Sequence, residues 1–420
     1  MQYIRKNGMI DVNDAMEKGL IVFSEKEIHG ARKNKFWFNK HTWMYKEVDN
    51  EYGTYEEYSE IICYELAKLL NISNAEYDLA TYNEKRGVIT RSVTDPEKEN
   101  MISGTEVLTD VFDDYFVPKI HLYNNFIDLL SKFQINSFSD YEKLSDNDKK
   151  DFNKKIIQAY NKSCFLIDDF IKCDDKINIK PLFEYCYELK DIYPENFTEM
   201  KNGIIMSNNL YDIWSAVEIY CKIRGYSIDI EKFMNDLSNM FIFDIITNQG
   251  DRHADNWSIN IDKNDYTVQL TALYDNSGAL ALNREKAIVN IDDFSKRLKV
   301  ETKPGKQKGI YRQLKQTIEH SFSGVKISAD DVYNRRRNDE LLDSFIYQSS
   351  NEFVNKLKEA ISLLTIENIE KIFNNIETRT SHPIPEIVKN VTREVLSYNI
   401  RKIDEKLSIW KGEQNGHKKI

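Results

Sequence analysis

The chain has 420 residues, of which 41% are hydrophobic, 12% aromatic and 30% charged. This composition predicts a globular protein long enough for two lobes or domains, and it excludes long disordered regions. A formal net charge of -10 argues against a protein that mainly coats nucleic acid, because such binding depends on clustered Lys and Arg.

The first part of the chain predicts a small β-sheet with one helix. Aromatic and β-branched clusters between Leu20 and Val48 indicate short strands with turns. Thr54 is expected to cap a helix, with Glu57 three residues later completing a capping box. After this helix, Glu76 to Tyr82 and Gly87 to Val93 are expected to pair as strands.

From about Glu106 onward the pattern becomes mainly helical, because apolar residues recur at steps of three and four. The clearest helical segments are Leu122 to Phe133, Lys149 to Ile171, Leu210 to Arg224 and Ile230 to Thr247. A strand pair, Asn256 to Ile261 and Tyr266 to Leu273, interrupts them, and amphipathic helices are expected from Asp331 to Trp410. The sequence therefore predicts an α+β protein.

The most informative segment connects an apolar helix to this strand pair. It reads Gly250-Asp251-Arg252-His253-Ala254-Asp255-Asn256, so Asp251 and Asn256 stand five positions apart. If the two strands form a hairpin, Asp275 returns beside them. Phosphoryl transfer needs a carboxylate near the attacking hydroxyl and oxygen ligands for Mg²⁺. The segment therefore predicts a phosphotransferase that uses ATP and Mg²⁺.

This loop resembles that of the HipA-like kinases and, more distantly, that of phosphatidylinositol kinases. Leu273 to Gly278 resembles the metal-binding segment that follows in HipA-like proteins. The resemblance implies a bilobal protein-kinase-like fold, with a small β-rich N-lobe over residues 1–105. A larger, mainly α-helical C-lobe would cover residues 106–420.

The resemblance also implies a role for each matching position in the loop. Asp251 would be the catalytic base, and Asn256 and Asp275 would bind Mg²⁺. His253 is placed with the catalytic residues, as a side chain that orients the loop by hydrogen bonds rather than as a metal ligand. The alternative interpretation is a solvated polar loop without chemistry.

The N-terminal part resembles the ATP-binding region of the same family. Trp43 to Glu47 resembles the strand with the ATP-binding lysine, so Lys46 would contact the α- and β-phosphates; the alternative is a lysine that only reaches the surface. Glu60 in the next helix would orient Lys46, with Glu56 and Glu57 as competitors.

The strand Gly87 to Val93 resembles the one that leads into the kinase hinge, where backbone groups near Ser92 and Val93 would meet adenine. The chain has no GxGxxG loop, so phosphate contacts from Ser24 to Gly30 are expected from position alone. Ser24 and Ser277 are candidate autophosphorylation sites.

The favoured function is that of a HipA-like serine/threonine protein kinase with a protein substrate. By family analogy it would be a toxin with an antitoxin partner, of the short form without the extra N-terminal domain of long HipA toxins. A lipid or small-molecule kinase and a non-catalytic nucleotide-binding module are the alternatives. No direct nucleic-acid binding is expected.

No apolar run is long enough to span a bilayer, and the N-terminus lacks the apolar stretch of a signal peptide, so a cytoplasmic location without membrane contact is expected. The five cysteines are scattered, which predicts reduced thiols. The lysine-rich stretch Lys296 to Lys315 is expected either as a solvated face or as a docking segment in the position of a kinase activation segment.

Overall fold

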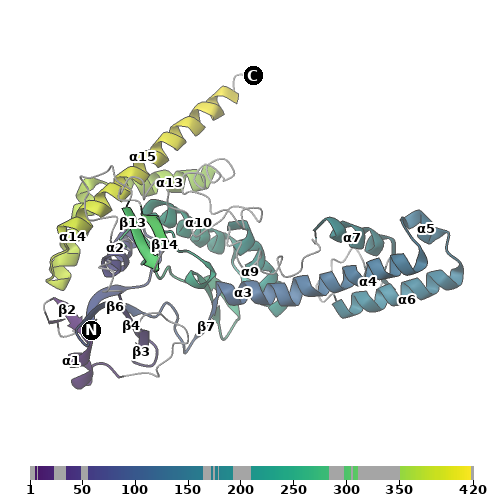
Figure 1. The fold of residues 1–420 in the computed structure, drawn as a ribbon, viewed down its shortest axis with the longest axis horizontal. Helices are drawn as coiled ribbons and strands as arrows, with labels where there is room; N and C mark the ends of the chain where they lie inside the picture. Colours follow the sequence, from purple (N-terminus) through teal and green to yellow (C-terminus); the bar gives the residue numbers. More distant parts are fainter. Residues whose placement is uncertain are drawn as a thin grey trace.

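A computed structural model gives the fold (Figure 1). The described residues are 5–6, 8–22, 35–48, 55–163, 172–173, 176–177, 179–192, 210–282, 298–303, 306–310 and 351–417. A small β-rich part contacts a larger helical part, and a group of helices projects from the latter to one side (Figure 1). The two-part α+β architecture expected from the sequence is confirmed.

The β-rich part is a six-stranded sheet in the order β1-β2-β5-β6-β4-β3. The strands are β1 (Arg5–Lys6), β2 (Met9–Asp11), β3 (Lys35–Phe38), β4 (Trp43–Glu47), β5 (Tyr77–Tyr82) and β6 (Lys85–Arg91), and a short helix, α1 (Val12–Glu17), follows β2. β5 and β6 are joined by Asn83 and Glu84, which both have positive φ, as expected of a tight hairpin turn. This turn is shorter than the four-residue turn expected from the sequence.

The expected capping box at Thr54 and Glu57 is wrong. The helix α2 (Glu56–Leu69) has Tyr55 as its N-cap, without a side-chain capping bond, and Thr54 lies outside the described residues. The N–H of Tyr55 instead donates to the carbonyl of Leu282, 2.9 Å away. A contact with a distant segment therefore sets where this helix begins.

The helical part contains a second sheet, in the order β10-β12-β11-β7. Its strands are β7 (Glu99–Ser103), β10 (Ser227–Ile228), β11 (Ser258–Asp262) and β12 (Thr267–Leu270). β11 and β12 form the hairpin expected after the polar loop. β7 pairs with β11, and the division of the chain at residue 105 remains a prediction.

The described helices from Gly104 onward include the four expected between Leu122 and Thr247 and those expected after residue 350, together with others at 104–116, 138–142 and 179–192 that the sequence pattern did not single out. They are α3 (Gly104–Val111), the π-helical turn η1 (Phe112–Phe116), α4 (Val117–Phe133), α5 (Phe138–Glu142), α6 (Asp146–Ser163), α7 (Ile179–Ile192), α9 (Leu210–Arg224), α10 (Ile230–Thr247), α13 (Asn351–Leu363), α14 (Ile366–Thr380) and α15 (Glu386–His417). α9 and α10 have the bounds expected from the sequence. Within the described residues, no helix is both long and apolar enough to cross a membrane.

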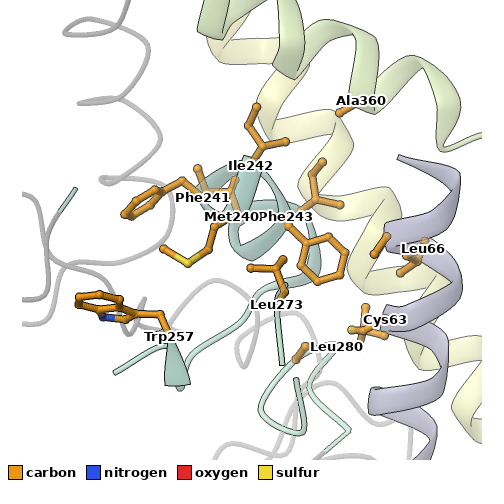
Figure 2. Close-up of a cluster of buried hydrophobic side chains, with 14 of the residues drawn as sticks. Cys63, Leu66, Met240, Phe241, Ile242, Phe243, Trp257, Leu273, Leu280 and Ala360 are labelled. Carbon is orange, nitrogen blue, oxygen red and sulfur yellow. The ribbon is translucent and has the colours of Figure 1, made fainter. Parts of the chain in front are cut away.

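The main core joins the two parts of the molecule. Figure 2 shows Phe243 of α10 pointing toward Cys63 and Leu66 of α2, with Leu273 and Leu280 beside them, while Met240 and Phe241 lie on the side of Trp257; all of these side chains are buried. Apolar contact on this scale is the main stabilising force in a fold. α2 and α10 therefore contribute to one core, although the two helices belong to different lobes.

A second cluster stabilises the projecting helices α4 to α7 (Figure 1). The ring of Phe183 on α7 packs edge-on against Phe126 on α4, with centroids 4.9 Å apart, and also contacts Phe138 and Phe152. These helices therefore have an apolar core distinct from the main one. Cys63, Cys186 and Cys221 are buried free thiols, as expected.

Candidate active site

Lys46 on β4 makes the central ion pairs of the candidate site. Its Nζ lies 2.8 Å from Oε1 of Glu60 on α2 and 2.5 Å from Oδ1 of Asp275. Lys46 and Glu60 are 5% and 1% exposed. The structure thus brings together the expected ATP lysine, its expected partner and one expected metal ligand.

The two glutamates that competed with Glu60 in the sequence lie elsewhere on α2. Glu57 is buried, and its Oε1 lies 3.1 Å from Nη1 of Arg86. Glu56 is the half-buried first residue of the helix. The contact with Lys46 is made by Glu60.

Electrostatic interactions keep the lysine and the aspartate charged. Burial lowers the pKa of Lys46, but the carboxylates of Asp275 and Glu60 raise it overall, well above its ordinary value. Burial raises the pKa of Asp275, but the charges of Lys46 and then Lys35 hold it below its ordinary value. An opposite charge within about 4 to 6 Å favours the ionised form in each case. The site therefore holds a buried, charged ammonium group between two carboxylates.

Asp275 adopts a left-handed backbone conformation, with a φ of 52°. Its N–H donates to Oη of Tyr77 on β5 (3.0 Å), and its Oδ1 accepts a bond from Oγ of Ser277 (2.8 Å). The next residue, Asn276, donates its N–H to Oε2 of Glu60 (2.8 Å). A left-handed residue with a side chain is uncommon and is often found at functional sites. Here the contacts from both lobes hold it.

Gln249 connects the catalytic loop with the segment that carries Asp275. Its Oε1 accepts the N–H of Asp251 (3.1 Å), and its Nε2 donates to the carbonyl of Asp275 (3.1 Å). A Cβ added to Gly278 would lie only 2.8 Å from Cβ of Asp251, so the two segments pack closely. The side chain of Asp251 is 59% exposed, which leaves it open to a hydroxyl of another molecule.

Asn256 closes the loop five residues after Asp251. Its Nδ2 donates to the carbonyl of Asp251 (2.6 Å) and lies 3.4 Å from Nε2 of His253. Nδ1 of His253 accepts the N–H of Asp255 (3.2 Å), and Nε2 lies 3.9 Å from Oδ1 of Asp251. His253 thus lies beside the expected base, and its orienting role remains a prediction.

Arg252 is fully buried, although the sequence suggested only a member of a polar loop. Its Nη2 lies 3.0 Å from Oδ1 of Asp244 on α10 and donates to Oδ1 of Asn276 (2.8 Å). Its Nη1 donates to the carbonyls of Asn256 (2.9 Å) and Tyr274 (2.7 Å). This one side chain therefore holds α10, the catalytic loop and the Asp275 segment together.

The sequence contains a signal for this missed role. Asp244 interrupts the apolar run Met240 to Ile246, so the helical pattern buries a carboxylate. A buried carboxylate requires a charged or hydrogen-bonding partner. Arg252, eight positions later, is the nearest arginine that follows it in the chain.

The expected hinge residues Ser92 and Val93 follow β6. The N–H of Ser92 donates to the carbonyl of Thr42 (2.8 Å), and the carbonyl of Val93 accepts a bond from Nδ2 of Asn260 (3.0 Å). Ser92 and Val93 line a cavity of about 880 Å³ together with Trp43. The lining of this cavity does not include the ion-paired lysine, and adenine contacts at the hinge remain a prediction.

Two other expectations fall wholly or partly outside the described residues. Ser24 to Gly30, expected to cover the phosphates, lies outside them. In the stretch Lys296 to Lys315, the structure describes the backbone of β13 (Leu298–Lys303) and β14 (Lys306–Ile310), which pair as an antiparallel ribbon. Neither expectation is tested.

The chemistry of the donor set fits magnesium. Among the described residues, no three His, Cys, Asp or Glu side chains gather as a metal-binding group. Asp275 offers a carboxylate, and Asn256 offers a carboxamide oxygen, because only its Nδ2 is used in the bond to Asp251. Magnesium prefers oxygen ligands and is commonly held by one or two protein side chains together with substrate phosphates.

Comparisons with known proteins agree with this geometry at the level of the fold. No protein-family model matches the chain, and a search of curated proteins finds no match. The crystal structure of the Helicobacter pylori proinflammatory kinase CtkA has a TM-score of 0.50 and 15% sequence identity to this chain. The similarity covers 92% of this chain and 97% of that one. It shows a two-lobed kinase fold.

A second similarity is to HipA of Shewanella oneidensis MR-1, a toxin–antitoxin system protein solved with HipB and operator DNA. It covers 96% of this chain and 70% of that one, at 10% identity and a TM-score of 0.36, and this value is too low to carry an argument. The two-lobed kinase fold that the catalytic loop implied is therefore confirmed by the likeness to CtkA.

Proposed function

We propose that the protein is an ATP- and Mg²⁺-dependent kinase that phosphorylates serine or threonine hydroxyls of proteins, as HipA-like kinases do. The observation that carries the proposal is the meeting of Lys46 and Glu60 from the N-lobe with Asp275 from the C-lobe. A lysine–glutamate ion pair beside a metal-binding aspartate is the arrangement on which kinase activity depends. The kinase fold around it supports the same conclusion.

In this proposal Lys46 binds the α- and β-phosphates, and Glu60 fixes its position. The exposed carboxylate of Asp251 accepts the proton of the attacking hydroxyl while the oxygen–phosphorus bond to the γ-phosphoryl group forms and ADP leaves. Asn256 and Asp275 hold Mg²⁺, which neutralises phosphate charge when bound. Backbone groups near Ser92 and Val93 receive adenine.

The experiment supplies γ-labelled ATP and Mg²⁺ together with three candidate acceptors: the protein itself, a bacterial lysate and lipid vesicles. Label in the protein or in lysate proteins, on phosphoserine or phosphothreonine, supports the proposal. Label in lipid only would favour the lipid-kinase alternative. ATP binding without transfer to any acceptor would favour the non-catalytic module.

The biological context stays a prediction from the sequence. It comprises the toxin role, the antitoxin partner, the absence of direct nucleic-acid binding and the cytoplasmic location. Growth arrest on expression in a bacterial host, lost in Asp251→Ala, supports a toxin. Unimpaired growth with the active protein contradicts it.

A further inference from the structure

Lys35 is a second lysine on the face of the sheet that carries Lys46. It opens β3 and stands directly opposite Lys46 on β4. Directly paired residues of an antiparallel sheet have side chains on the same face. Nζ of Lys35 lies 4.0 Å from Oδ2 of Asp275, whereas Lys46 contacts Oδ1 of the same carboxylate. Each oxygen of Asp275 therefore faces its own lysine.

The charges around Lys46 show that this lysine alone does not balance the two carboxylates beside it. Lys46 lies against two carboxylates, those of Glu60 and Asp275, so these three groups together carry one negative charge. A triphosphate is strongly anionic, and like charges at close range repel. Lys35 brings the charge of this group of four residues to zero before Mg²⁺ is counted.

The two lysines also differ in exposure: the side chain of Lys35 is 29% exposed, whereas that of Lys46 is 7% exposed. Lys35 can therefore reach an incoming ligand at a smaller desolvation cost than Lys46. It also lies five residues after Gly30, the end of the segment in which phosphate contacts are expected, and this chain has no GxGxxG motif there. A lysine binds phosphate as a point charge on a flexible stem.

We propose that Lys35 is a second phosphate-binding residue, which contacts the β–γ end of the bound nucleoside triphosphate while Lys46 holds the α–β end. This assignment rests on the proposed function, because it presupposes a nucleotide at the Lys46 site. Lys35 acts on the phosphate chain and not on the base or the ribose.

Calorimetric binding of AMP, ADP and ATP with Mg²⁺ tests this assignment in the full-length wild-type protein and three variants, Lys35→Met, Lys35→Arg and Lys85→Met. Lys35→Met should weaken ATP binding roughly 10- to 100-fold, the effect of losing one charged hydrogen bond. AMP binding should stay unchanged, which also shows that the variant is folded. Lys35→Arg keeps the charge and should retain most of the affinity for ATP.

Lys85→Met is the matched control, because Lys85 lies on the same sheet but is exposed and pairs with Glu47. It should bind all three nucleotides as the wild type does. Unchanged ATP binding in Lys35→Met, or equal weakening of AMP and ATP, would overturn the role of Lys35. If the wild-type protein binds no ATP, the proposed function is wrong as well. If the wild type transfers phosphate from ATP and Lys46→Met does not, the proposed function stands, whatever the result for Lys35→Met.

Discussion

At the scale of single residues, the charge on Asp275 links the site to stability. Burial raises the pKa of this carboxyl, but Lys46 and Lys35 hold it below the ordinary value of about 3.9. A depressed folded-state pKa contributes stability that is fully present above the unfolded pKa and lost as pH falls through the folded pKa. The contribution should therefore begin to shrink as the pH falls below about 4, and it is fully lost only below the folded-state pKa, which lies lower still.

Asp275→Asn removes this titration. The difference in unfolding free energy between the wild type and Asp275→Asn should be constant from pH 5 to 7 and should shrink as pH falls below about 4. Urea denaturation at each pH measures it. A difference that does not change with pH contradicts the ion pairs of Asp275 with the two lysines.

The buried ion pair between Arg252 and Asp244 can be tested through its contribution to stability. Asp244→Asn keeps the shape of the side chain but leaves the fully buried guanidinium without its carboxylate. Breaking one partner of a buried ion pair costs about 3–5 kcal/mol of stability. Glu218→Gln, in an exposed pair with Lys222 on α9, is the control and should change stability little. Equal small effects of the two substitutions, in chemical denaturation, would refute the structural role of Arg252.

At the scale of elements, the close packing of the catalytic loop against the Asp275 segment can be tested at Gly278. A Cβ there would meet Oε1 of Gln249 at 2.6 Å and Cβ of Asp251 at 2.8 Å, so Gly278→Ala must displace the loop. A displacement of about 1 Å can cost roughly 100-fold in rate. We expect Gly278→Ala to lower the rate of phosphoryl transfer at least about tenfold.

Gly225→Ala provides the control, because Gly225 has a φ of 69° and nothing within 4 Å of an added Cβ. It should lower stability through backbone strain but leave the transfer rate unchanged. If Gly278→Ala transfers phosphate as fast as Gly225→Ala, the loop does not depend on this contact.

The helices also show which parts of the fold can be predicted from the local sequence. α9 and α10 are predictable because the helical period is repeated within each segment. The start of α2 is not, because it depends on the carbonyl of Leu282, more than 200 positions away. The hairpin β11–β12 predicts that Asp275 returns toward Asp251. The residues that hold these two segments together cannot be predicted from the local sequence, because they act through tertiary contacts.

Gln249 and Arg252 illustrate this limit. Gln249 reaches the carbonyl of Asp275, 26 positions later, and Arg252 reaches Asn276, 24 positions later. Neither contact follows from the helical or strand periodicity of the sequence. Only the unusual position of Asp244 within an apolar helix indicates that a buried cation is needed.

At the scale of the whole molecule, the helices α4 to α7 form a projecting unit with its own core (Figure 1). Helical periodicity predicts that each helix has an apolar face, but not that these faces pack on one another instead of on the main core. Phe183→Ala should destabilise this unit by about 3–5 kcal/mol, the usual cost of removing a buried phenyl ring.

Because the two cores are distinct, amide hydrogen exchange should show lost protection in α4, α6 and α7 of Phe183→Ala, while α10 stays protected. Phosphoryl transfer should continue. Equal loss of protection in α10 would mean that the projecting helices and the kinase body unfold as one unit.

In the proposed enzyme, Asp251 and Asp275, from separate segments, act on one nucleotide held by Lys46. The most direct test of this arrangement is the transfer of label from γ-labelled ATP by the wild type, Asp251→Ala and Asp275→Ala, with a substitution at the last residue of β11, Asp262→Ala, as the control. We expect labelled protein with the wild type and with Asp262→Ala, and at least about 100-fold less label with the two site variants, whose folds remain intact. Labelling by Asp251→Ala and Asp275→Ala at the wild-type rate would contradict it.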